Sequence, residues 1–181
     1  MKQWLFNPFV YVAGLRALTL GLGIMVVTAI ISYISGANFH GMLSIHTGLK
    51  APLYIFFLEQ VNAWGCSVLL FYLSSILFSR SAVRLIDIAG TLALARWPMI
   101  FLSLAGFIPL PTGLNDLNAA FVVTEIVSVL IEIWVIALMY NAYRISGNLK
   151  GERATISFIA VLIIGEIISN AISHQLLKHI I

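Results

Sequence analysis

Five long apolar segments divide this sequence, and each is long enough to cross a lipid bilayer as a helix. A membrane-spanning helix needs about 20 mostly apolar residues. Segments of that kind lie at approximately residues 15–35, 52–78, 84–108, 118–143 and 154–177. The sequence therefore predicts an all-α membrane protein, a bundle of five transmembrane helices.

Little of the chain remains outside these segments. Hydrophobic residues make up 61% of the 181 residues and charged residues 9%, whereas a soluble domain carries about 25% charged residues. The connections are too short for a soluble module or a nucleotide-binding fold. We predict one transmembrane domain, residues 1–181, in which residues 1–14 form an interfacial segment. Its aromatic side chains are expected at headgroup depth: Trp4, Phe6, Phe9 and Tyr11.

Basic residues near the helix ends predict the orientation of the bundle, because cytoplasmic loops carry an excess of Lys and Arg. One side of the membrane would receive Lys2, Arg16, Arg80, Arg84, Arg144, Lys150 and Arg153, and the other side Lys50 and Lys178. We predict a cytoplasmic N-terminus and an extracytoplasmic C-terminus, in a bacterial cell inner membrane. The net charge of +3 is explained by attraction of these basic residues to anionic lipid headgroups on the cytoplasmic side. No nucleic-acid partner is expected.

Five charged side chains interrupt the apolar segments: Glu59, Arg96, Glu125, Glu132 and Glu166. A charge near the bilayer centre costs about 2.5–3.5 kcal/mol on insertion scales, so such residues usually face the interior of a bundle or a wet cavity. They are therefore candidates for a functional site.

Helical periodicity gathers these residues with other polar ones. Glu59 and Asn62 share a face of the second segment, as do Glu125 and Glu132 of the fourth. The expected topology places some candidates in the outer half of the membrane, namely Glu59, Glu125, Asn170 and His174, and others near its middle, namely Arg96, Glu132 and Glu166. Together they predict a polar crevice that is open to the extracytoplasmic side, with Arg96 near its floor.

The charges of this crevice do not balance, since four ionised glutamates would face one arginine. In one interpretation, some glutamates are protonated and donate hydrogen bonds that hold helices together, and Arg96 pairs with a glutamate. In the other, the crevice binds a proton, a cation or a small polar ligand. A bound cation would take carboxylate oxygens with the carbonyls of Asn62 or Asn170. No spacing selects one metal.

No motif names a reaction, because the sequence has no His-Glu-x-x-His, nucleophile elbow or Gly-rich phosphate loop. Dispersed residues on the outer side are a further candidate metal set: His40, His46, Asp116, His174 and His179. An intramembrane metal-dependent hydrolase is therefore kept as a third alternative, behind interpretations without catalytic activity.

Proline, glycine and asparagine mark the breaks between helices. Pro98 predicts a kink within the third segment, and Gly90 with Ala93 predicts a close approach to another helix. Residues 36–51 and 109–117 are expected to be outer loops, and Asn115, Asp116 and Asn118 to cap the fourth helix. Residues 144–153 are expected to form a cytoplasmic turn.

The third segment includes the run Arg-Leu-Ile-Asp-Ile-Ala-Gly-Thr-Leu-Ala-Leu-Ala-Arg-Trp-Pro at residues 84–98. This run, with Gly90 before the mid-span Pro98, resembles the Yip domain family of five-span membrane proteins. The resemblance implies the span order and the cytoplasmic N-terminus. It also points to the prokaryotic branch of the family, since the chain lacks the long hydrophilic N-terminal region of the eukaryotic members, which interact with Rab/Ypt GTPases in vesicle trafficking.

Two functions follow as hypotheses. The first is a Yip-like membrane protein whose carboxylate-rich crevice binds a proton, cation or small polar ligand and serves transport. The second is a structural or partner-organising membrane protein, in membrane trafficking or organisation, which binds a protein partner or a second copy of itself.

Overall fold

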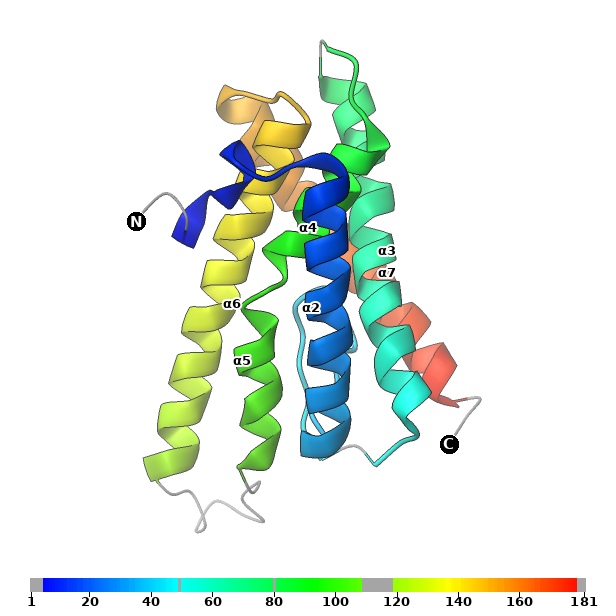
Figure 1. Ribbon diagram of the computed structural model, residues 1–181, viewed down its shortest axis with the longest axis vertical. Helices are drawn as coiled ribbons and strands as arrows, with labels where there is room; N and C mark the ends of the chain where they lie inside the picture. The colour runs from blue at the N-terminus through cyan, green and yellow to red at the C-terminus, as the bar shows by residue number, and fades with distance from the viewer. Residues whose placement is uncertain (1–4, 49, 80, 109–118, 179–181) are drawn as a thin grey trace.

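A computed structural model describes residues 5–48, 50–79, 81–108 and 119–178, and most of these residues are helical (Figure 1). The helices are α2 (Gly14–Ser35), α3 (Leu53–Phe78), α4 (Leu85–Ala95), α5 (Met99–Leu104), α6 (Ala119–Ser146) and α7 (Gly151–Lys178), with 3₁₀ turns η1 (Pro8–Val10) and η2 (Ala105–Phe107). Five of the helical stretches have the length and hydropathy of membrane spans, the third being Leu85–Phe107. The predicted five-span all-α fold is confirmed.

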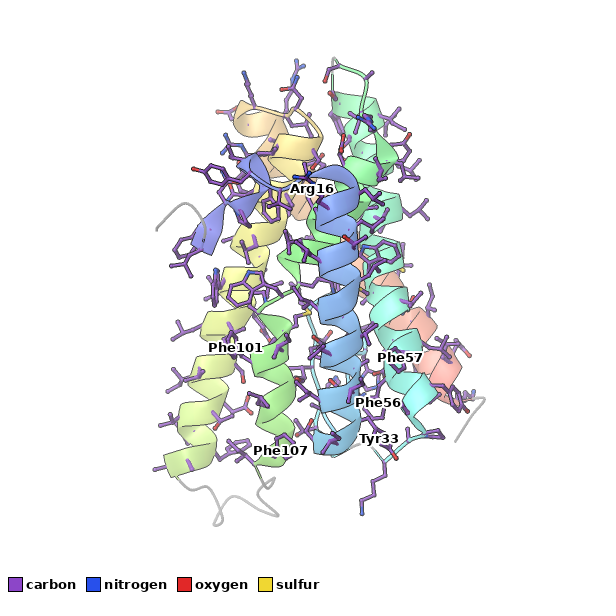
Figure 2. All side chains as sticks on the ribbon, in the orientation of Figure 1. Arg16, Tyr33, Phe56, Phe57, Phe101 and Phe107 are labelled. Atoms are coloured by element: carbon purple, nitrogen blue, oxygen red, sulfur yellow. The ribbon has the colours of Figure 1, made fainter. Side chains whose placement is uncertain are left out.

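The spans run alternately up and down, so that α2, α4 and α7 begin at the same end of the bundle (Figure 1). This end carries Arg16, Arg84, Arg144, Lys150 and Arg153, whereas Lys50 and Lys178 lie at the other. Figure 2 shows Arg16 at the first end and Phe107 at the second. The predicted segregation of basic residues is therefore present in the fold. Lys2 and Arg80 lie outside the described residues.

The third span forms the centre of the bundle. In its most apolar stretch 67% of the residues are buried, against 17–33% in the other four spans. The reason is that α4 packs against α2, α3 and α6. Small residues allow this packing: a Cβ added at Gly21 would lie 2.5 Å from the carbonyl carbon of Ala93, and one at Gly90 would lie 2.5 Å from the carbonyl oxygen of Gly14. The close approach predicted at Gly90 and Ala93 is confirmed.

The central span is broken where the sequence predicts a kink. Helix α4 ends at Ala95 and α5 begins at Met99, so that Arg96, Trp97 and Pro98 form the junction. Proline has no N–H to continue the helical ladder. The break places the Arg96 side chain near the middle of the bundle, where it is 1% exposed.

The connector between α2 and α3 does not form the outer loop that the sequence predicts. Asn38 and His46 form an antiparallel bridge, with N–H···O distances of 2.8 and 2.9 Å, and the chain between them turns back into the bundle. Phe39 and Met42 are fully buried there. Non-helical backbone is tolerated at membrane depth only where protein or a water-filled cavity surrounds it. We call residues 36–48 the re-entrant connector.

The segment before α2 is also more deeply placed than predicted. Phe9, expected at headgroup depth, is 2% exposed and belongs to the hydrophobic core. The carbonyls of Leu5 and Phe6 accept hydrogen bonds from Trp134 and Asn141 of α6, which fixes the segment along that helix. Trp4, the loop at residues 109–117 and the predicted cap at Asn115, Asp116 and Asn118 lie outside the described residues.

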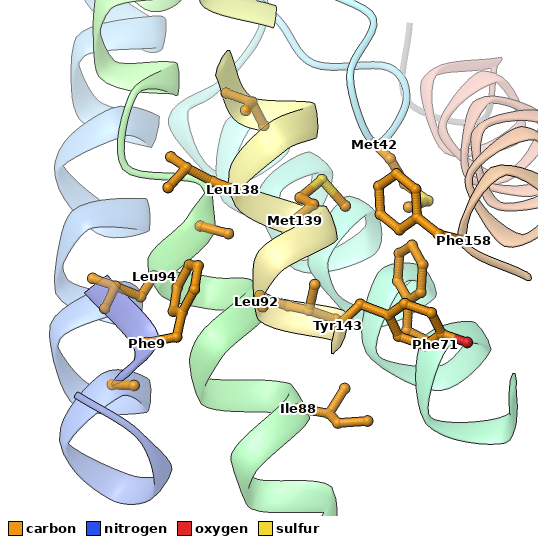
Figure 3. Close-up of a cluster of buried hydrophobic side chains, with 14 of the residues drawn as sticks. Phe9, Met42, Phe71, Ile88, Leu92, Leu94, Leu138, Met139, Tyr143 and Phe158 are labelled. Carbon is orange, nitrogen blue, oxygen red and sulfur yellow. The ribbon is translucent and has the colours of Figure 1, made fainter. Parts of the chain in front are cut away.

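Buried aromatic rings join α3, α6 and α7 (Figure 3). The ring of Phe71 lies 5.0 Å from that of Tyr143 and 5.4 Å from that of Phe158. The hydroxyl of Tyr143 is within 2.7 Å of Ser74 Oγ and 2.9 Å of Ser157 Oγ. These contacts hold the three helices together at the end where α7 begins.

Candidate functional site

The re-entrant connector meets the charged residues of the spans, and Glu59 of α3 is its first contact. Glu59 is 2% exposed. Its carboxylate accepts hydrogen bonds from the backbone N–H of Phe39, at 3.1 Å, and from Asn38 Nδ2, at 3.4 Å. An ionised carboxylate only accepts hydrogen bonds, so both contacts use it as an acceptor.

Arg96 also binds the connector. Its Nη1 donates to the carbonyl oxygen of Met42 at 2.8 Å, and its Nη2 lies 3.4 Å from Gln60 Oε1 of α3. The predicted ion pair between Arg96 and a glutamate is wrong for the described residues, in which Arg84 and Asp87 form the one ion pair. The break in the third span directs the guanidinium toward a backbone carbonyl instead.

Glu166, near the middle of α7, holds the tip of the connector. Its carboxylate accepts hydrogen bonds from the backbone N–H groups of Leu43, at 2.9 Å, and Ser44, at 3.1 Å. It also accepts one from the Ser44 hydroxyl. Asn170, one turn further, donates to Glu166 at 2.9 Å and to Ser44 Oγ at 3.0 Å. The connector therefore lies where the sequence predicts an open crevice.

The two glutamates of α6 have no such partners. Glu132 is half-buried and Glu125 is exposed, and neither makes a hydrogen bond to a described residue. The charged neighbours of Glu132 are Glu166 and Glu125. Glu166 therefore contacts the connector tip directly, and Glu132 adds a second carboxyl group near Glu166 from a different helix.

The remaining candidates are divided between helix packing and the end of the bundle where α7 ends. Asn62 joins α3 to α7 by donating to the Ser169 carbonyl at 2.9 Å and to Ser173 Oγ at 2.8 Å. Cys66 Sγ lies 3.4 Å from Asn62 Oδ1. Asn62 is thus a helix-to-helix bridge, whereas His174 is exposed.

Three histidines gather where the connector enters the bundle. The rings of His40 and His46 are 4.7 Å apart. Burial, and next the neighbouring charges of His46 and His174, lower the pKa of His40 below its ordinary value. Across the described ranges, no group of three His, Cys, Asp or Glu side chains is arranged to hold a metal ion. Asp116 and His179 of the predicted outer set lie outside those ranges.

Sequence reasoning missed the partners of the charges. Gln60 is 2% exposed and stands beside Arg96, and Asn38 is 1% exposed beside Glu59. A signal existed for Gln60, since it is a polar residue within an apolar span. Nothing comparable marked Asn38 or Ser44, because a polar residue in a connector is usually solvated.

The polar centre that results consists of Glu59, Gln60, Arg96, Glu132 and Glu166 with the connector tip at residues 42–44. Comparison of the chain with protein-family models, with curated proteins and with solved structures found no match.

Proposed function

We propose that the protein binds a proton or a small cation at this polar centre, in the middle of the membrane, and that the binding serves transport. The observation that carries the proposal is the meeting of a broken span and a re-entrant connector at Arg96, with the carboxyl group of Glu166 as its charged neighbour. Transporters place their sites near the bilayer midplane and build them from discontinuous helices.

The hydrogen-bond network of the centre is incomplete, which supports a binding role. Arg96 Nε and Gln60 Nε2 are buried without an acceptor among the described residues, and Glu132 has no donor there. A purely structural network is expected to satisfy its buried members. The two N–H groups suit an acceptor such as water, and the carboxyl group of Glu132 suits a proton or a cation.

The charges of the centre point to a positive ligand. Arg96 is the single buried basic side chain of the described ranges. Its charged neighbour is Glu166, and the centre also includes the carboxyl groups of Glu59 and Glu132. If all three were ionised, two negative charges would remain uncompensated in a medium of low dielectric. A proton or a small cation would remove that excess.

The test uses the purified full chain in proteoliposomes with an internal dye that is sensitive to pH or to the cation under test. We expect proton or cation flux that is lost in Glu132→Gln and in Glu166→Gln. Glu152→Gln, an exposed acid in the first turn of α7, should leave the flux unchanged. Equal behaviour of all three variants and the unsubstituted chain, including absence of flux in each, would contradict the proposal.

A second candidate is a partner-organising membrane protein. It is supported by α6, the least buried span at 17%, which presents the exposed carboxyl group of Glu125 on its outer surface. A partner helix or a second copy would cover that group. Site-specific cross-linking from position 125 in membranes should then trap a discrete adduct, and cross-linking from Ile163 of α7 should not.

We also propose membership of the Yip domain family, with a cytoplasmic N-terminus in a bacterial inner membrane. The support is the broken third span with its Gly90 contact and the excess of basic residues at one end. Cysteines placed at Ser81 and Lys50, in a Cys66→Ser background, test the orientation. An impermeant thiol reagent added outside the cell should label position 50 alone.

A further inference from the structure

The outer surfaces of α3 and α7 enclose an apolar groove that the polar centre does not use. The two helices pack side by side, and the groove between them has a volume of about 590 Å³. Aliphatic side chains form most of its walls: Leu70, Leu73 and Leu77 from α3, with Ile156, Ala160 and Ile164 from α7. In a membrane this surface faces lipid.

The length of the groove matches one leaflet. It extends from Phe78 to Leu70 along α3 and from Arg153 to Ile164 along α7, which is about 12–17 Å at 1.5 Å per residue. The hydrocarbon core of a bilayer is about 30 Å thick. The groove therefore covers the depth of the acyl chains on the side where α7 begins.

A cationic pocket continues the groove at that end. This second cavity, of about 380 Å³, is lined by Phe78, Asn148, Leu149, Lys150 and Arg153. Phe78 and Arg153 line both cavities. The side chains of Lys150 and Arg153 make no ion pair or hydrogen bond to the described part of the chain. Two basic side chains without a partner in the described part of the chain therefore lie next to the apolar groove, at headgroup depth.

We propose that this groove and pocket form a binding site for one anionic phospholipid. The phosphate lies between Lys150 and Arg153, since a guanidinium matches phosphate oxygens with two parallel hydrogen bonds. One acyl chain lies between α3 and α7. A zwitterionic lipid would bring its own cation to the two basic side chains, so the site selects a headgroup of net negative charge. This site is separate from the polar centre and does not depend on its function.

Native mass spectrometry of the detergent-purified full chain tests the headgroup. With phosphatidylglycerol added, we expect one retained lipid per chain, and with phosphatidylcholine much less. The double variant Lys150→Gln, Arg153→Gln should weaken phosphatidylglycerol retention about tenfold or more. Arg144→Gln is the matched control, because Arg144 lies over the Tyr140 ring, at 5.6 Å, and lines neither cavity. Equal retention in the double variant and the control would overturn the proposal.

A second pair of variants tests the acyl groove. Ala160→Phe fills the groove from an exposed position of α7 and should displace the lipid, whereas Ala171→Phe, exposed on the same helix, should not. If Ala160→Phe retained phosphatidylglycerol while the charge variant lost it, the interaction would be with the headgroup alone and the groove assignment would fail. Displacement of the lipid by an equal concentration of glycerol phosphate would instead identify a site for a soluble anion, which also contradicts the proposal.

Discussion

At the scale of single residues, Arg96 shows how this protein accommodates a buried charge. Its Nη1 donates to the Met42 carbonyl at 2.8 Å. Arg96→Met would leave that carbonyl without its donor, so we expect the free energy of unfolding to fall by about 1–3 kcal/mol. Arg96→Lys should lower the free energy of unfolding by less, because an ammonium can still donate to the carbonyl but lacks the planar fork of the guanidinium. Chemical unfolding in detergent measures both, with the exposed Arg144→Met expected to change stability by no more than about 0.5 kcal/mol. Equal losses in Arg96→Met and Arg144→Met would contradict this role.

At the scale of elements, the re-entrant connector depends on the absence of a side chain at Gly41. A Cβ added there would overlap Glu166 Oε1 and would lie 2.5 Å from Asn170 Nδ2. We expect Gly41→Ala to push the connector tip from α7 and to cost about 1–3 kcal/mol of stability. Gly65→Ala is the control, since nothing lies within 4 Å of a Cβ added at Gly65. This second change removes a glycine from the middle of α3 and should stabilise the protein by up to about 1 kcal/mol. Thermal unfolding of the two variants should therefore shift in opposite directions, and a shift in the same direction would argue against a tightly inserted connector.

The elements also differ in how far the sequence predicts them. The spans follow from hydropathy because each must satisfy its backbone inside an apolar medium, and the break at Pro98 follows from the missing N–H. The connector does not follow, since its depth depends on contacts with Glu59, Arg96 and Glu166 from three different spans. Periodicity places these three side chains on inward faces but does not identify backbone amides and a carbonyl as their partners.

At the scale of the whole molecule, the pH dependence of unfolding should report the histidines at the mouth of the connector. Burial, followed by the charges of His46 and His174, lowers the pKa of His40 from its ordinary 6.5. The unfolded chain therefore binds more protons than the folded one as the pH falls through about 6.5, and stability falls with it. We expect His40→Gln to flatten the stability profile between pH 7.5 and pH 5.5, because the group that titrates differently in the two states is gone. His46→Gln removes one of the lesser causes and should give an intermediate slope. Denaturant midpoints at several pH values measure these slopes. An unchanged slope in His40→Gln would show that other groups of the molecule carry its acid sensitivity.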